Sequence, residues 1–321
     1  MEKASALRWA CVAAGMLGTL VILLVQDLTM ASAPRAGGGV YWVADRDAGT
    51  LYELDSDLFL TRRIPCPWPL DIERAADGGL FVLRSGNAGP NFGQRLSVFA
   101  AGGELLSETW LETCTDLDTR DGRAALLLQP LEQGPRSRAL SIDREGRLEV
   151  LGEGEHWRSI LGWRGEVFVG AGAGAGAAQG RILRLHGSST ELSRPVVDLA
   201  AGAGALYALE CGTRACVTRL DAQLQREWTH ELGFAAAHLA VGETGEVWVA
   251  DTASGRVRCL GSDGALRWER SDLPLIGLDR TLAGREGAVL IQAPGALLRL
   301  DSNGGNLPGQ GGFAFVTDLC R

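Results

Sequence analysis

A pattern that recurs about every 40 residues constrains the fold of this chain more than any other feature. A glycine followed by a short apolar run appears seven times along the chain. The equivalent positions are Val40, Leu80, Ala125, Val167, Leu206, Val247 and Val289, and successive copies are 39 to 45 residues apart. Self-similarity at a fixed period of this length indicates a repeat architecture.

Each copy contains four strand-like elements. A second run such as Leu51–Asp55 or Leu297–Asp301 follows the first, and a third strand comes after a turn in most copies. Another short element, such as Leu70–Glu73, precedes the apolar run. Four strands per 40 residues is typical of a β-propeller. The pattern therefore predicts an all-β, seven-bladed β-propeller over residues 40–321, with six blades and a degenerate terminal hairpin as the alternative.

The two ends of the chain are predicted to meet. The first copy begins at its second strand, Val40–Ala44, so its first strand is missing. The C-terminal segment Phe313–Leu319 resembles that first strand, because its Thr-Asp-Leu also occurs at Thr115–Leu117. We expect the C-terminal strand to complete the first blade, which closes the ring and removes exposed strand edges.

The N-terminus carries a targeting signal. Lys3 and Arg8 precede an uncharged apolar run from Trp9 to Val25. Positive charge before such a run keeps the N-terminus in the cytoplasm and places the rest outside. We expect a signal-anchor or a cleaved signal peptide over residues 1–25, a flexible linker over residues 26–39, and a propeller that is periplasmic or extracellular, membrane-anchored or secreted.

The cysteine count agrees with export. Six cysteines follow Cys11, which lies inside the apolar run, and an even number permits disulfides outside the cytoplasm. Cys211 and Cys216 flank a four-residue stretch between two strand-like runs. Opposite positions on a hairpin lie close enough for a disulfide. The pair is thus a candidate disulfide, and two unrelated buried thiols are the other interpretation.

The segment Glu246–Leu260 (EVWVADTASGRVRCL) resembles the NHL repeat, and Val40–Leu54 (VYWVADRDAGTLYEL) is a weaker copy. The resemblance implies a six- or seven-bladed propeller that binds partners more often than it performs chemistry. It also implies that Asp251 and Arg256 tie neighbouring strands together and that Asp45 does half of this. The strand ends at Trp228 and Trp268 show a weaker similarity to quinoprotein-like propellers with docked tryptophans.

One column of polar residues is expected to line the central channel. Aligning the innermost strands places six residues at one level: Asp71, Asp116, Asp198, His238, Gly277 and Asp318. Such a ring is a candidate site for a ligand or for a divalent cation such as calcium or magnesium. Crowded carboxylates also raise one another's pKa, which can yield a general acid. Alternatively, each side chain caps its own strand or binds channel water.

No catalytic constellation is visible, so no catalytic residue is assigned. The histidines lack metal-ligand spacing, and the chain has no nucleophile elbow. The net charge of −8 without a basic patch argues against nucleic acid as a partner. The sequence favours an extracytoplasmic module that binds a protein or small-molecule partner on the propeller rim. A metal-dependent hydrolase of lactonase or esterase type is the first alternative, and a quinoprotein-like dehydrogenase is the second.

Overall fold

A computed structural model describes most of the chain after residue 40. The described residues are 41–86, 93–129, 136–172, 179–211, 214–242, 244–251, 253–274, 281–283, 289–293, 295–314 and 316–320. Every regular element among them is a β-strand. Among these residues there is no long apolar helix that could cross a bilayer. The predicted N-terminal segment 1–25 and the linker 26–39 lie outside the described residues, as do Gly277 and its predicted strand.

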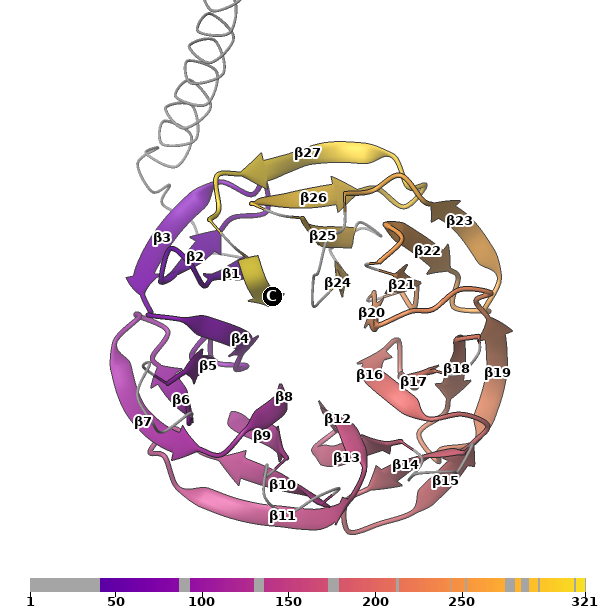
Figure 1. Ribbon diagram of the computed structural model, residues 1–321, viewed down its shortest axis with the longest axis horizontal. Coiled ribbons are helices and arrows are strands. Elements are labelled where there is room, and N and C mark those ends of the chain that lie inside the picture. Colours follow the sequence, from indigo (N-terminus) through magenta and orange to yellow (C-terminus); the bar gives the residue numbers. More distant parts are fainter. Residues whose placement is uncertain are drawn as a thin grey trace, which may run out of the picture.

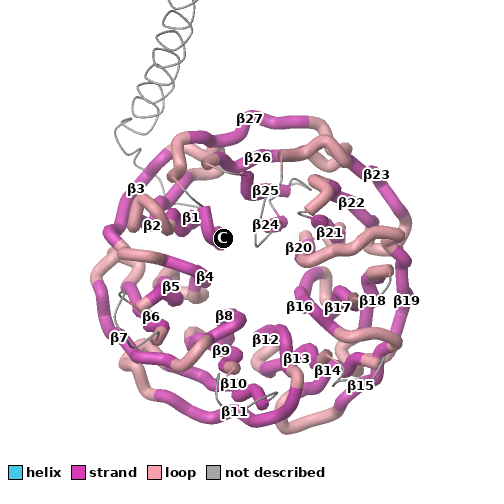
Figure 2. The backbone as a smooth tube through the Cα atoms, viewed as in Figure 1, coloured by secondary structure: helices cyan, strands magenta, loops and turns pink. Residues whose placement is uncertain are grey.

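The strands form seven four-stranded antiparallel sheets that circle a common axis (Figures 1 and 2). Sheet 1 contains β28 (Val316–Cys320), β1 (Tyr41–Asp45), β2 (Thr50–Leu54) and β3 (Leu60–Pro65). Sheet 2 contains β4 (Pro69–Arg74), β5 (Leu80–Ser85), β6 (Gln94–Phe99) and β7 (Leu105–Leu111). Sheet 3 contains β8 (Cys114–Arg120), β9 (Arg123–Leu128), β10 (Arg136–Ile142) and β11 (Leu148–Glu155). Sheet 4 contains β12 (Trp157–Trp163), β13 (Glu166–Ala171), β14 (Gly180–Arg184) and β15 (Ser189–Leu192).

The remaining three sheets follow the same order, with the innermost strand first. Sheet 5 contains β16 (Val196–Gly202), β17 (Ala205–Glu210), β18 (Cys216–Leu220) and β19 (Arg226–Glu231). Sheet 6 contains β20 (His238–Val241), β21 (Val247–Asp251), β22 (Arg256–Leu260) and β23 (Leu266–Arg270). Sheet 7 contains β24 (Thr281–Ala283), β25 (Val289–Ala293), β26 (Ala296–Leu300) and β27 (Asn306–Gly311). The all-β propeller architecture predicted from the repeat is confirmed.

The C-terminal strand closes the ring, as predicted. β28 pairs with β1, so that Trp42 lies opposite Cys320 and Val43 opposite Leu319. The Thr317 hydroxyl lies 3.2 Å from the carbonyl oxygen of Ala44 and 3.0 Å from that of Pro69. The last residues of the chain therefore contact both the first sheet and the start of the second (Figure 1).

The hydrophobic core consists of apolar layers between neighbouring sheets. β1 and β17 are buried along their whole length because each is covered on both faces. Between sheets 2 and 3, for example, Phe81, Leu96 and Leu126 belong to one buried cluster. Burying apolar area in this way is the main favourable contribution to folding. A sheet alone has two exposed apolar faces, so each depends on both neighbours.

Tryptophans of one sheet dock on turns of the next. The Trp228 Nε1–H of sheet 5 donates to the carbonyl oxygen of Ser262 in sheet 6 at 3.0 Å. The Trp268 Nε1–H of sheet 6 donates in the same way to Ser302 in sheet 7 at 2.9 Å. The indole rings lie against Gly264 and Gly304, the positive-φ residues of those turns. The similarity to tryptophan-docked repeats therefore has a structural counterpart at both predicted positions.

The structure does not show the predicted disulfide between Cys211 and Cys216. Both are free thiols, as are the other four cysteines in the described part of the chain. The reason is register: in the β17–β18 hairpin Glu210, not Cys211, lies opposite Cys216. Adjacent residues of a strand point to opposite faces, so a one-residue offset separates the two sulfur atoms.

Candidate functional site

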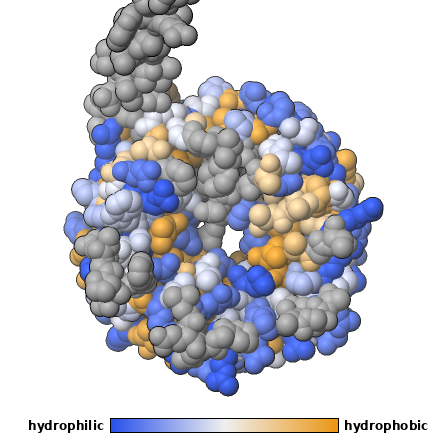
Figure 3. Space-filling model, viewed as in Figure 1, coloured by the Kyte–Doolittle hydropathy of each residue, from blue (hydrophilic) through white to orange (hydrophobic). Residues whose placement is uncertain are grey.

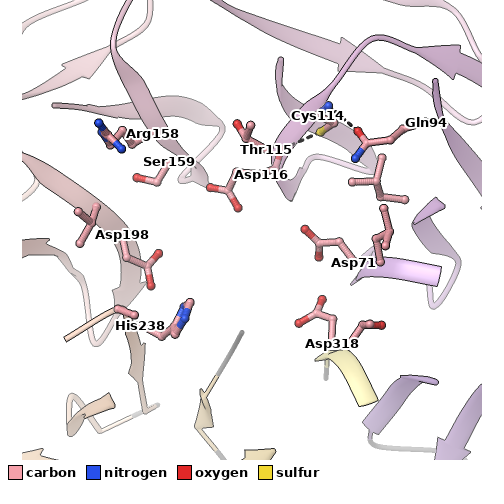
Figure 4. Close-up of a pocket in the computed structure, with 15 residues that line it drawn as sticks. Asp71, Gln94, Cys114, Thr115, Asp116, Arg158, Ser159, Asp198, His238 and Asp318 are labelled. Carbon is pink, nitrogen blue, oxygen red and sulfur yellow. Dashed lines mark hydrogen bonds between the residues drawn. The ribbon is translucent and has the colours of Figure 1, made fainter. Parts of the chain in front are cut away.

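The five described residues of the predicted column line one cavity at a mouth of the central channel (Figure 4). They come from the innermost strands of five sheets: Asp318 (β28), Asp71 (β4), Asp116 (β8), Asp198 (β16) and His238 (β20). The cavity has a volume of about 340 Å³. The structure thus brings together the residues that the alignment of the repeats placed at one level.

Three of the carboxylates connect neighbouring sheets. Asp318 Oδ2 accepts from the backbone N–H of Ile72 at 2.9 Å, so it links sheet 1 to sheet 2. In the same way Asp116 Oδ2 accepts from Ile160 N–H at 2.8 Å, and Asp198 Oδ2 from Leu239 N–H at 2.9 Å. In each case the donor directly follows the residue that occupies the column position in the next sheet. The column therefore stabilises the ring, since hydrogen bonds to a charged acceptor are stronger than neutral ones.

The second oxygen of two of these carboxylates binds the residue's own strand. Asp198 Oδ1 accepts from Leu199 N–H at 2.9 Å, and Asp116 Oδ1 from Leu117 N–H at 3.2 Å. This agrees with the interpretation that each side chain caps its own strand.

Sequence reasoning missed three polar residues of the channel. Ser159 occupies the column in sheet 4, and its buried hydroxyl has no hydrogen-bond partner among the described residues. Asp118, two residues after Asp116, accepts from Gly162 N–H at 2.6 Å and adds a second link between sheets 3 and 4. Arg158 lies at the cavity rim (Figure 4). The alternation of β8 could have indicated Asp118, since residues i and i+2 share a face.

The described lining of the channel carries an excess of negative charge. Among the described residues, Arg158 is the only arginine or lysine that lines the cavity, against four carboxylates. A second cavity of about 230 Å³ continues along the innermost strands; it shares Asp116 and Asp198 and adds Glu73 and Asp118. An opening is visible at the centre of the face in Figure 3. Carboxylates around a cleft with low-dielectric walls concentrate cations there.

The described side chains do not fit a metal ion. No three His, Cys, Asp or Glu side chains in this part of the chain are placed so that they could hold one. The aspartates are spread around the ring and turn toward backbone N–H groups of neighbouring sheets. The predicted calcium or magnesium site is therefore not supported, and we derive no reaction through it.

The described lining also lacks aromatic rings. Among the residues that the structure describes, no tryptophan, tyrosine or phenylalanine lines either channel cavity. A quinoprotein-like site was expected to show a wide channel with stacked tryptophans. The observed lining of small, aliphatic and acidic side chains does not favour that alternative.

Comparison with solved structures reveals similar folds at low sequence identity. BamB from Moraxella catarrhalis matches with a TM-score of 0.56 at 12% identity, over 89% of this chain and 88% of that chain. Virginiamycin B lyase from Staphylococcus aureus matches with a TM-score of 0.56 at 14% identity, over 76% and 84%. AztD from Citrobacter koseri matches with a TM-score of 0.55 at 10% identity, over 87% and 96%. The chain shares their β-propeller fold.

These similarities concern the fold alone, because the identities are 10–14%. No family model matches the chain. No curated protein matches it in sequence. Membership of the NHL family therefore stays a prediction that rests on the residues of the two repeat segments.

The residues that carried the NHL resemblance stabilise turns and strand pairs. Asp251 caps the β21–β22 turn, where its Oδ2 accepts from the Ser254 hydroxyl at 2.5 Å. Arg256 lies opposite Asp251 and reaches Glu269 of β23, with 3.6 Å between Nε and Oε1. Asp45 accepts from the N–H groups of Ala48 at 3.1 Å and Ala314 at 2.7 Å. The side-chain hydrogen bonds of Asp251 to described residues stay within its own turn, whereas Arg256 reaches the next strand, so the strand-tying roles that the resemblance implies stay predictions.

Proposed function

We propose that this chain is an extracytoplasmic binding protein that takes a small organic cation at the mouth of its channel. The observation that carries the proposal is the convergence of four carboxylates from four sheets on one cavity of about 340 Å³, where Arg158 supplies the one guanidinium among the described lining residues. A ligand with two or more ammonium groups complements this charge. Hydrogen bonds from ammonium N–H donors to carboxylates are charge-assisted and therefore strong.

The fixed positions of the channel aspartates favour a binding role over catalysis. Asp116, Asp198 and Asp318 hold backbone N–H groups of neighbouring sheets, which fixes their position and favours a rigid binding site. A preformed cavity on a rigid scaffold binds its ligand without the cost of ordering flexible loops.

The extracytoplasmic location is part of the proposal. It rests on the charged and apolar pattern of residues 1–25, which attaches the chain to a membrane or directs its export. The cysteines no longer contribute to this argument, because the described ones are free. We place the channel mouth outside the cytoplasm, where it meets small cations from the surroundings.

Calorimetric titration with the polyamine spermidine tests the proposed function. Spermidine is expected to bind one site on the purified protein, and added salt is expected to weaken the binding. The variant Asp71→Asn keeps the size of the side chain but removes one charge. It should bind about fivefold more weakly, since a charge pair at a partly hydrated site contributes about 1 kcal/mol.

The variant Asp57→Asn is the matched control, because it removes the same charge from an exposed turn away from the channel. It should bind spermidine as the parent protein does. No binding of spermidine, or equal loss of affinity in both variants, would overturn the proposal. A ligand-free melting curve for each variant separates loss of binding from loss of fold.

A further inference from the structure

Two exposed tryptophans lie at the junction of sheets 1 and 2. Trp68, in the connection between β3 and β4, is 52% exposed, and Trp110 on β7 is 58% exposed. They are the only tryptophans among the large exposed apolar side chains of the described residues. Neither lines a channel cavity. Leaving two large indoles in water forgoes the stabilisation that burial provides, which marks this surface for binding.

Strand register places the backbones of the two tryptophans near the two ends of one row of paired residues. Arg84 of β5 lies opposite Arg95 of β6, which lies opposite Trp110. Directly paired residues share one face of a sheet. The backbone of Trp68 lies beside the inner end of this row, because its carbonyl oxygen accepts from Ser85 N–H at 3.0 Å. We call Trp68, Arg84, Arg95, Glu108 and Trp110 the indole–guanidinium surface.

The backbone holds Trp68 in a strained conformation. Its φ is +55°, a region that bulky side chains rarely adopt. Pro67 and Pro69 flank it and restrict the chain on both sides. The Arg84 Nε–H donates to the Pro67 carbonyl oxygen at 3.1 Å and fixes the loop further. Strain kept at an exposed aromatic residue points to function, and a fixed indole binds at low entropic cost.

The polar part of this surface is positively charged. Arg84 and Arg95 share one carboxylate, Glu108, at 2.5 Å and 3.4 Å. The Arg95 guanidinium carbon lies 3.8 Å from the centre of the Trp110 ring, and the Arg95 side chain is 29% exposed. Two guanidinium groups against one carboxylate leave one positive charge in excess, in a chain whose net charge is −8. Arg95 can therefore pair with an anionic group of a ligand.

We propose that the indole–guanidinium surface binds a saccharide chain that carries carboxylates. The C–H face of a sugar ring packs flat on an indole, and a uronate carboxylate pairs with a guanidinium in a bidentate way. The surface is open, so an extended chain that gathers several contacts suits it better than an enclosed small molecule. Charged side chains separate the two indoles, whereas a protein interface needs a more continuous apolar centre.

Titration of the full-length protein with hexagalacturonate tests this proposal, with cellohexaose as the neutral comparison. We expect hexagalacturonate to bind, with affinity falling as salt rises. Trp110→Ala should weaken binding at least tenfold, and Arg95→Gln should weaken it and reduce the salt dependence. Leu266→Ala is the control, because Leu266 is 51% exposed on β23 of sheet 6. It should leave the affinity unchanged.

Loss of saccharide binding can be distinguished from loss of stability in each variant. Trp68→Ala keeps the positive φ of the loop but removes the indole, so its melting curve is measured beside its affinity, and Arg95→Gln tests the same surface without touching the loop. Failure of hexagalacturonate to bind, equal binding of cellohexaose, or parental affinity in both Trp110→Ala and Arg95→Gln would overturn the proposal. A partner protein that requires Trp110 while neither saccharide binds would also overturn it.

Discussion

Burial governs the chemistry of the cysteine side chains. Desolvation raises the pKa of Cys66, Cys216 and Cys259 to about 12. It also raises the pKa of Cys114 and Cys320. The thiolate is the reactive form, so these side chains stay protonated and inert near neutral pH. Cys211, in the loop after β17, is the least buried of the six.

Thiol labelling is therefore expected to single out Cys211. At pH 8 in the native protein, a maleimide should modify Cys211 first. Cys66, Cys216 and Cys259 should react about a thousandfold more slowly than a free cysteine in solution, because a pKa near 12 leaves very little thiolate at that pH. Peptide mapping by mass spectrometry measures each site, and labelling in urea supplies the control in which all react. Recovery of a disulfide-linked peptide with Cys211 and Cys216 would contradict the register described above.

At the scale of the elements, the contact between a tryptophan and a tight turn joins neighbouring sheets. Gly264 has a φ of +77°, and a Cβ added there would lie 2.9 Å from the Trp228 ring. Gly122 has nearly the same φ, +74°, but no atom within 4 Å of an added Cβ. Substituting both glycines therefore separates two free-energy costs. One is the cost of a Cβ at positive φ, and the other is the cost of displacing the indole.

Alanine at these two positions is expected to have unequal effects. Gly122→Ala should destabilise the protein by about 1 kcal/mol, the cost of a left-handed conformation with a Cβ. Gly264→Ala should cost about 1–3 kcal/mol more, because it also forces Trp228 away from its hydrogen bond to Ser262. Urea unfolding monitored by tryptophan fluorescence measures both. Equal midpoints for the two variants would show that the docked indole contributes nothing.

The repeat could be predicted from the sequence because it depends on local pattern. Residue types alone reveal the apolar runs, the C-terminal strand and turn glycines such as Gly264 and Gly304. The features that could not be predicted concern contacts between neighbouring strands or neighbouring sheets. Whether Cys211 or Glu210 faces Cys216 depends on a one-residue register. That Asp198 reaches the backbone of the next sheet depends on how the sheets are staggered, which no single repeat encodes.

In the whole molecule, the pairing of the C-terminal strand β28 with β1 closes the ring. The described part of sheet 1 takes β28 from the C-terminus and three strands from residues 41–65. Removal of residues 313–321 would leave the inner edge of β1 without its partner. It would also remove the Asp318 bond to Ile72 and the Asp45 bond to Ala314. Both the sheet and its contact with sheet 2 would then be weakened.

A chain that ends at Gly312 is expected to melt at least about 5 °C lower than the full chain, since about 1 kcal/mol corresponds to about 2–4 °C for proteins of this size. It should also self-associate, because the exposed edge of β1 presents unpaired N–H and C=O groups to other strands. A synthetic peptide of residues 313–321 added in excess should occupy the edge and raise the melting temperature, whereas a scrambled peptide should not. Calorimetry and light scattering measure the two effects. A truncated chain that stays monomeric and melts with the parent would show that the ring holds through its apolar interfaces alone, without the strand pair of β1 and β28.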